Sequence, residues 1–151
     1  MSNSKNVHLF VGTHKGAFIL TSDLDRKKWN LNGPFHPGVD VHYMFCDTRN
    51  EPTIYASINS EIWGPTVRYS TDMGETWVEA EQDVRFEEGS DRKVKRVWCT
   101  IPGGDNYPGV LYAGVDPGAM FKTEDGGKNW SELTDLAITP LAKNGFQAQE
   151  D

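Results

Sequence analysis

A run of hydroxyl, carboxylate and glycine residues between two strand-like segments is the first feature of this chain that could do chemistry. The run reads Ser70-x-Asp72-x-Gly74-x-Thr76-Trp77. Its oxygens could bind a metal ion, cap a turn or serve an active site. The spacing and terminal bidentate Glu of a calcium loop are missing, so we expect no metal. Side-chain caps on backbone N–H groups, with a glycine supplying positive φ, favour a hairpin turn.

The same pattern recurs along the chain. A second copy reads Thr123-x-Asp125-x-Gly127-x-Asn129-Trp130. A degenerate first copy, Thr21-x-Asp23-x-Asp25, reaches Trp29 only with one extra residue. The three tryptophans lie 48 and 53 residues apart. Repetition at this period is typical of propeller blades, and we expect each tryptophan to pack between neighbouring sheets.

The elements around these turns are short apolar strands broken by Gly, Pro, Asn and Asp, which indicates an all-β fold. Paired strands fill 7–29, 53–77 and 110–130, and a further strand precedes the second and third units at 39–47 and 94–101. Each full unit therefore has four strands, A (inner) to D (outer). We expect Cys46 and Cys99 to occupy equivalent places in the two A strands, as small core residues.

Ser70, Asp72, Gly74, Thr76 and Trp77 match every specified position of the bacterial neuraminidase repeat, or Asp-box, which this chain resembles. The phrases LFVGTHKGAFIL and LYAGVDPGAMFKT also resemble bacterial proteins described as sialidase-like or glycosidase-like. The resemblance implies a β-propeller with the motif in the C–D turn, away from any axial pocket. Sialidases, xyloglucan hydrolases, sortilin-type receptors and photosystem assembly factors all carry the repeat, so it does not fix the function.

We expect three blades within 1–139, at about 1–30, 39–80 and 94–134, followed by an irregular tail at 140–151. The first blade lacks its own strand A. Because propellers close with roughly four to eight blades, three leave the end blades exposed. Either the chain is an N-terminal fragment of a longer propeller, which the loss of the repeat after Thr139 favours, or copies self-associate through the end blades.

Chain direction places the B–C turns and the D-to-A connections on one rim around the axis. An aromatic ring beside carboxylates and arginine is a reasonable carbohydrate-binding set. A pair such as Glu61 with Asp116 could supply the acid and base of glycoside hydrolysis. The alternative is a solvated loop surface, with Trp63 packed between blades. The candidate rim residues are His14, Lys15, His36, Asp40, Glu61, Trp63, Arg85, Glu88, Arg96 and Asp116, and His42 also lies on an inner strand.

Three observations argue against a sialidase. That family holds its acidic sugar with three arginines, the first in a Phe/Tyr-Arg-Ile-Pro phrase that this chain lacks. The net charge of −7 gives no help with an anionic sugar, and it gives no support to a nucleic-acid partner. The tyrosine nucleophile of that family comes from later blades.

The remaining features are bland. No run reaches membrane-spanning length and the N-terminus has no apolar signal region, so we expect a cytoplasmic protein without a membrane partner. No phosphate-binding or nucleotide motif occurs, and we expect no cofactor. The sequence therefore predicts a sialidase-like propeller module that binds, and when complete could hydrolyse, a glycan. A non-catalytic scaffold for protein–protein interaction is the alternative.

Overall fold

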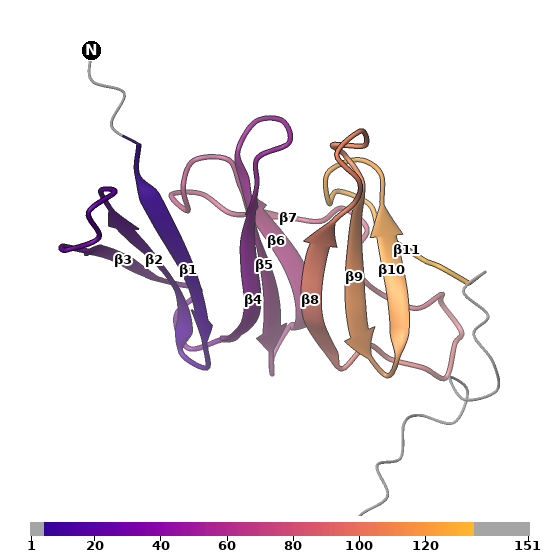
Figure 1. Cartoon of the computed structure of the whole chain (residues 1–151). Helices are drawn as coiled ribbons and strands as arrows, with labels where there is room; N and C mark the ends of the chain where they lie inside the picture. Colours follow the sequence, from indigo (N-terminus) through magenta and orange to yellow (C-terminus); the bar gives the residue numbers. More distant parts are fainter. Residues whose placement is uncertain (1–4, 135–151) are drawn as a thin grey trace, which may run out of the picture.

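The computed structural model describes residues 5–134, so the expected tail at 140–151 lies outside the described residues. Every regular element in this range is a strand, which confirms the all-β class. The strands form three separate antiparallel sheets that stand side by side in chain order (Figure 1). The chain visits each sheet once and then moves to the next.

Each sheet is a meander. The first contains β1 (Val7–Thr13), β2 (Gly16–Ser22) and β3 (Asn30–Phe35). The second contains β4 (Asp40–Asp47), β5 (Thr53–Ser60), β6 (Gly64–Ser70) and β7 (Val78–Glu79). The third contains β8 (Arg96–Pro102), β9 (Leu111–Asp116), β10 (Ala119–Thr123) and β11 (Ser131–Glu132). The first sheet has three strands because no inner strand pairs with β1 among the described residues.

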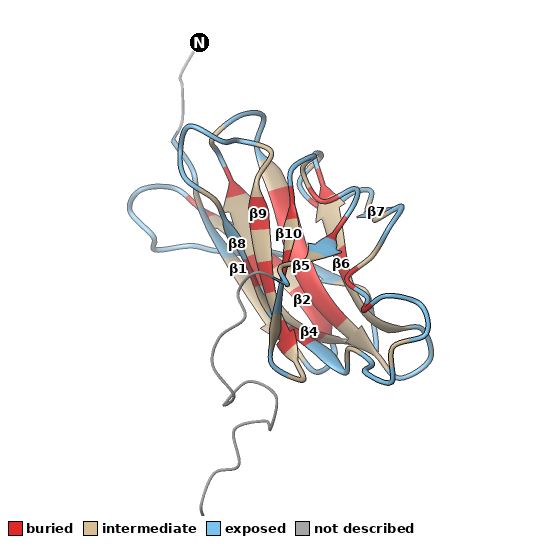
Figure 2. Cartoon of the chain, turned by 90° about the vertical axis from the view of Figure 1, so that its right-hand side faces the viewer, coloured by how far each residue is buried: buried red, intermediate tan, exposed pale blue. Residues whose placement is uncertain are grey.

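The middle sheet is buried on both faces (Figure 2). Successive side chains of a strand point to opposite faces. Ile54 and Ile58 of β5 therefore pack against the first sheet, where Ile19 completes the cluster. Tyr55 points the other way and joins a second cluster with Phe121 of the third sheet. The core is thus two layers of side chains, one between each pair of adjacent sheets.

The turn between β6 and β7 is built as the sequence predicts. The Ser70 hydroxyl donates to the Asp72 carboxylate at 2.7 Å and accepts the Gly74 N–H at 2.8 Å. The same carboxylate accepts the backbone N–H of Thr76 at 2.9 Å. Gly74 has a φ of 93°, which a residue with a Cβ rarely adopts. We call this segment (70–77) and its equivalent between β10 and β11 (123–130) the capped turns.

The second capped turn repeats these bonds with two residues replaced. The Thr123 hydroxyl takes the place of Ser70, donating to Asp125 at 2.7 Å and accepting the Gly127 N–H at 3.1 Å. The Asn129 side chain donates to the Asp125 carboxylate at 2.8 Å, where Thr76 uses its hydroxyl. In each capped turn, one Asp carboxylate accepts the hydrogen bonds that close the turn.

The predicted alignment of the first, degenerate copy is wrong. Ser22, not Thr21, is the buried hydroxyl residue at the end of the strand, and it lies seven residues before Trp29, the spacing that the capped turns have. No extra residue is present. Leu24 and Arg26 stand where the Asp and Gly would be, and Arg26 itself adopts a φ of 53°. Asp23 caps the turn instead, accepting the N–H groups of residues 25 and 26.

The three turn tryptophans differ in burial because each faces the preceding sheet. The Trp77 ring lies 5.9 Å from that of Phe35 in β3. Trp130 is 1% exposed, packed on the middle sheet. Trp29 has no sheet before it among the described residues and is 38% exposed. The expectation that each ring lies between sheets therefore holds only where two sheets flank it.

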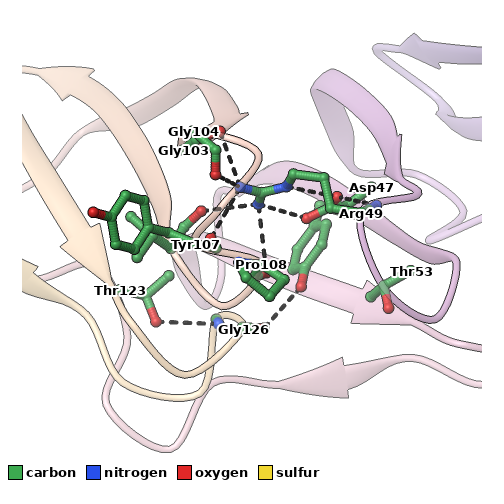
Figure 3. Close-up of polar contacts among 12 residues, drawn as sticks. Asp47, Arg49, Thr53, Gly103, Gly104, Tyr107, Pro108, Thr123 and Gly126 are labelled. Atoms are coloured by element: carbon green, nitrogen blue, oxygen red, sulfur yellow. Dashed lines mark hydrogen bonds and ion pairs between the residues drawn. The ribbon is translucent and has the colours of Figure 1, made fainter.

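A buried arginine joins the second and third sheets at the end that carries the capped turns (Figure 3). The Arg49 guanidinium, in the loop between β4 and β5, pairs with the Asp47 carboxylate at 2.7 Å. It also donates to backbone carbonyls of the loop between β8 and β9, at 2.9 Å to Gly103 and 3.0 Å to Val110. The hydrogen bonds from Arg49 hold the pKa of Asp47 below its usual range.

The predicted equivalence of Cys46 and Cys99 is also wrong. Cys46 lies opposite Ile54, at the first position of its neighbouring strand that faces the previous sheet. Cys99 lies opposite Gly114, three pairs further along the corresponding strand. Both thiols are free and half-buried. The two inner strands align through their bulges instead, as described below.

Gly74→Ala should destabilise the protein more than Gly64→Ala. Both glycines have positive φ, 93° and 85°, so both variants carry the strain of a left-handed alanine, roughly 1–2 kcal/mol. Only at Gly74 would the new Cβ meet a ring, 2.9 Å from Phe35, while nothing lies within 4 Å at Gly64. Urea unfolding gives the free energy of unfolding of each variant, and the difference between the two losses is the cost of the clash. Equal losses would contradict this packing of the turn against β3.

The capped turns should make the protein sensitive to acid. Hydrogen bonds from Thr76 and Ser70 lower the pKa of Asp72 to about 2 from 3.8. Burial raises the pKa of Asp125, but hydrogen bonds from Asn129 and Thr123 outweigh it and bring it to about 2. Both carboxylates bind protons more readily in the unfolded chain, so their stabilisation is complete above about pH 4 and is lost as the pH falls towards 2.

The double variant Asp72→Asn, Asp125→Asn tests this linkage. It should be less stable than the wild type at neutral pH, and the gap should narrow between pH 4 and pH 2. Chemical unfolding across that range measures the gap. A gap independent of pH would show that the two carboxylates do not titrate with folding.

Candidate functional site

One turn of each sheet lies at the same end of the molecule, the lower edge in Figure 1. They connect β1 to β2, β5 to β6 and β9 to β10. The capped turns lie at the opposite end. We call the three turns (13–16, 60–64 and 116–119) the turn rim. Chain direction predicts this shared end, and the candidate residues can now be placed on it.

Two inner strands each carry a bulge that the sequence analysis missed. The register of β4 on β5 shifts between Val41 and Tyr43, so His42 is the extra residue. The register of β8 on β9 shifts between Val97 and Cys99, which makes Trp98 the extra residue. A bulge re-aims the side chain that it inserts. The sequence gives no regular signal of these bulges, which become visible only in the pairing register of the strands.

The bulges bring His42 and Trp98 together, with ring centroids 5.4 Å apart. The Arg96 guanidinium lies over the Trp98 ring, 5.3 Å from its centroid, in cation–π geometry. Trp98 is 47% exposed. His42 Nε2 is buried without a hydrogen-bond partner among the described residues. We call these three residues the inner-strand cluster. It presents a flat aromatic face beside a cation.

The structure pairs two other rim candidates from different sheets. His14 Nδ1, in the first turn, lies 2.8 Å from the carboxylate of Asp40 at the start of β4. Lys15 beside it is exposed, and its carbonyl accepts the Gly38 N–H at 3.2 Å. Asp40 and Arg96 occupy corresponding positions of their strands, because both begin an inner strand two residues before its bulge.

The turn between β5 and β6 carries the most exposed apolar side chains of the rim. Trp63 is 72% exposed and Ile62 is 79% exposed. The Ser60 hydroxyl accepts the backbone N–H groups of both, at 3.2 Å. Trp63 is therefore not packed between sheets, and Glu61 beside it is exposed as well.

Asp116 lies on the next turn, half-buried and opposite Arg96 in the register of β8 and β9. Its carbonyl accepts the Lys95 N–H at 2.7 Å. Asp116 thus belongs to the same corner of the rim as the inner-strand cluster. The proposed pairing of its carboxylate with Glu61 stays a prediction.

Three candidates lie elsewhere. His36 packs its ring against Trp77 at 4.6 Å, half-buried between the first two sheets. Arg85 and Glu88 line an outer cavity of about 530 Å³ beside β7 and β11, whose walls include Glu79 and Glu132. Arg85 points outward because Val84 and Phe86 on either side are buried in the core.

Within residues 5–134, no group of three or more His, Cys, Asp and Glu side chains is arranged to hold a metal ion. No helix in the same range is long and apolar enough to cross a membrane.

Comparison with known proteins supports the fold alone. No family model matches the chain, and no curated protein sequence matches it either. A solved β-propeller described as "YCF48 bound to D1 peptide" is similar in structure, with a TM-score of 0.50 and 13% sequence identity. The similarity covers 88% of this chain and 43% of that one. The three sheets are therefore propeller blades, and the chain spans less than half the length of this neighbour.

His36→Asn should remove part of the pH dependence of stability. Burial, helped by the Arg68 charge, lowers the pKa of His36 to about 4 from 6.5. The unfolded chain therefore binds this proton first, and the wild type loses stability as the pH falls from 6.5 to 4. Asn tolerates the φ of 51° at this position. Unfolding free energies measured across this window should fall less steeply in the variant. Parallel slopes would contradict the burial of His36.

Proposed function

We propose that this chain is a propeller binding module whose turn rim binds an exposed segment of a partner protein. The observation that carries the proposal is the exposure of Trp63 and Ile62 at the tip of a turn, on the same end as the inner-strand cluster. A large apolar side chain in water gains free energy when a partner covers it. Nothing in the packing of the sheets requires either side chain at this position.

The residue types on the rim suit protein recognition. Tryptophan and arginine are enriched among residues that dominate binding energy at interfaces. Trp63 and Trp98 supply rigid surface with few rotamers to order, and Arg96 supplies charge-assisted hydrogen bonds to a carbonyl or carboxylate. The backbone of the rim is fixed by strands, so little ordering is needed on binding.

The structural neighbour offers an analogy. That propeller was solved bound to a D1 peptide. At 13% identity the likeness transfers no residue and no partner, so its support for a peptide-binding propeller is of the general kind that a shared fold gives.

A glycan is the second candidate ligand, favoured by the stacked Arg96 and Trp98 beside the His14–Asp40 pair. An aromatic face can pack on a sugar ring while polar groups bind its hydroxyls. Hydrolysis would further require two carboxyl groups roughly 5–10 Å apart across the bond, and Glu61 and Asp116 are the residues proposed for it.

Selection of linear peptides from a random display library on the immobilised chain tests the first candidate. Trp63→Ala and Trp98→Ala should each weaken the selected peptides about 30-fold, the effect of losing roughly 2 kcal/mol at an interface hot spot. Because Trp63 is exposed, its variant should unfold at nearly the wild-type urea concentration.

Tyr107→Ala is the matched control. Tyr107 is also an exposed aromatic residue, but it lies in the loop between β8 and β9 at the opposite end. Its loss should leave peptide affinity unchanged. Peptides that bind all three variants equally would contradict a rim site. Binding on a glycan array that Trp98→Ala abolishes, with no peptide selected, would favour the second candidate.

A further inference from the structure

The first blade exposes an apolar face that the other two blades bury. Leu9, Leu20 and Leu31 lie directly opposite one another across β1, β2 and β3. Ile19, the neighbour of Leu20, is buried against the second sheet. Because side chains alternate, the three leucines point away from that sheet. Leu31 is 64% exposed, and Leu9 is exposed too.

The positions that correspond to Leu9 are covered in the other two blades. Val7, Ile54 and Leu111 each pair with the hydroxyl residue that opens the following turn, so Ala56 of β5 and Ala113 of β9 align with Leu9. Both alanines are fully buried by the preceding sheet. Leu31 instead aligns with Glu79 and Glu132, and Glu79 is exposed although a sheet precedes it, so Leu9 is the residue that marks the uncovered face. Trp29 lies on the same uncovered side of the first blade, which accounts for its exposure. This face is one half of the type of interface that the chain forms twice, between its first and second sheets and between its second and third.

The third blade exposes the other half of that interface. In the middle sheet, Phe45 lies opposite Tyr55, and both pack towards the third sheet. Ile101 lies opposite Tyr112 at the same register of the third sheet, where no sheet follows among the described residues. Ile101 and nearby Met120 are exposed.

We propose that a second copy of this chain covers both faces, with the first blade of each copy packed on the third blade of the other. Each copy supplies three blades, so two copies make a ring of six. This number is within the roughly four to eight at which propellers close, and a third copy would exceed it. Two stretches of the matched length would also cover 86% of the solved propeller neighbour, since one covers 43%.

The arrangement has a consequence for the rim. A head-to-tail contact between unlike faces closes into a ring when the rotation per copy fits, here a half turn. The turns of both copies then surround one axis, and each inner-strand cluster faces its copy across it. The proposal does not depend on what the rim binds.

Light scattering behind a sizing column tests the proposal on the full chain. The wild type should have about twice the chain mass of 16.9 kDa. Leu9→Glu should weaken the dimer at least about tenfold, because an unpaired charge would be buried in the interface, where the equivalent Ala56 and Ala113 are fully covered. Leu24→Glu is the matched control: Leu24 is 63% exposed but lies in the first turn, off the sheet face. Its dimer should persist.

A mixing experiment establishes which faces meet. Met120→Lys should also weaken the dimer. An equimolar mixture of Leu9→Glu and Met120→Lys should recover dimers, because one contact is then wild type and the other brings the two opposite charges together. Circular dichroism and urea unfolding confirm that both variants are folded.

Three outcomes would overturn the proposal. The first is a wild-type monomer at all concentrations, as expected if the faces are covered by further blades of a longer protein. The second is a dimer lost in Leu9→Glu but intact in Met120→Lys, which would indicate contact between two first blades. The third is equal loss in Leu9→Glu and Leu24→Glu. Peptide binding by the rim is measured separately, so its failure is distinguishable.

Discussion

A propeller blade with two apolar faces is stable only between two neighbours, and the rest of this structure depends on that constraint. The middle sheet meets it within the chain, since Ile54 packs on the first blade and Tyr55 on the third. The gradient of burial from Trp29 to Trp130 has the same cause. Where the chain provides no neighbour, as at Leu9 and Ile101, apolar side chains lie in water. The stability of this protein therefore depends on whether the faces of its end blades are covered.

Covering the faces does not by itself set how blades align, and polar contacts do so here. The guanidinium of Arg49 reaches carbonyls of the neighbouring loop, and the hydroxyl of Tyr55 donates to the carbonyl of Gly126 at 3.0 Å. Burial of the Tyr55 phenol raises its pKa to about 12. Because buried donors lose free energy when unpaired, these bonds penalise any sliding of one blade along the next. Apolar packing supplies the attraction, and these donors supply the register.

The sequence predicts the fold better than the site. The turn motif occurs twice in the sequence with the same residue spacing, so the hydrogen bonds of the Asp72 and Asp125 carboxylates could be predicted from that spacing. The first copy was misaligned because Leu24 and Arg26 replace the two residues that define the pattern. The rim prediction found one end of the molecule but not which side chains meet there. His36 turned inward onto Trp77, and Arg85 faces the outer cavity because its two neighbours are buried. Trp98 was missed because a bulge leaves no regular period to detect.

The bulges at His42 and Trp98 have a consequence for how such a repeat can change. Each inner strand has one residue more than the strand it pairs with. The side chain at the bulge is therefore constrained neither by strand pairing nor by a position in the core. Two copies of the repeat fill it differently, with an imidazole and an indole. The residue at the bulge can thus differ from blade to blade while the strands and their pairing stay the same. Selection for new ligands, in nature or in the laboratory, can act on the bulge residue without altering the sheets.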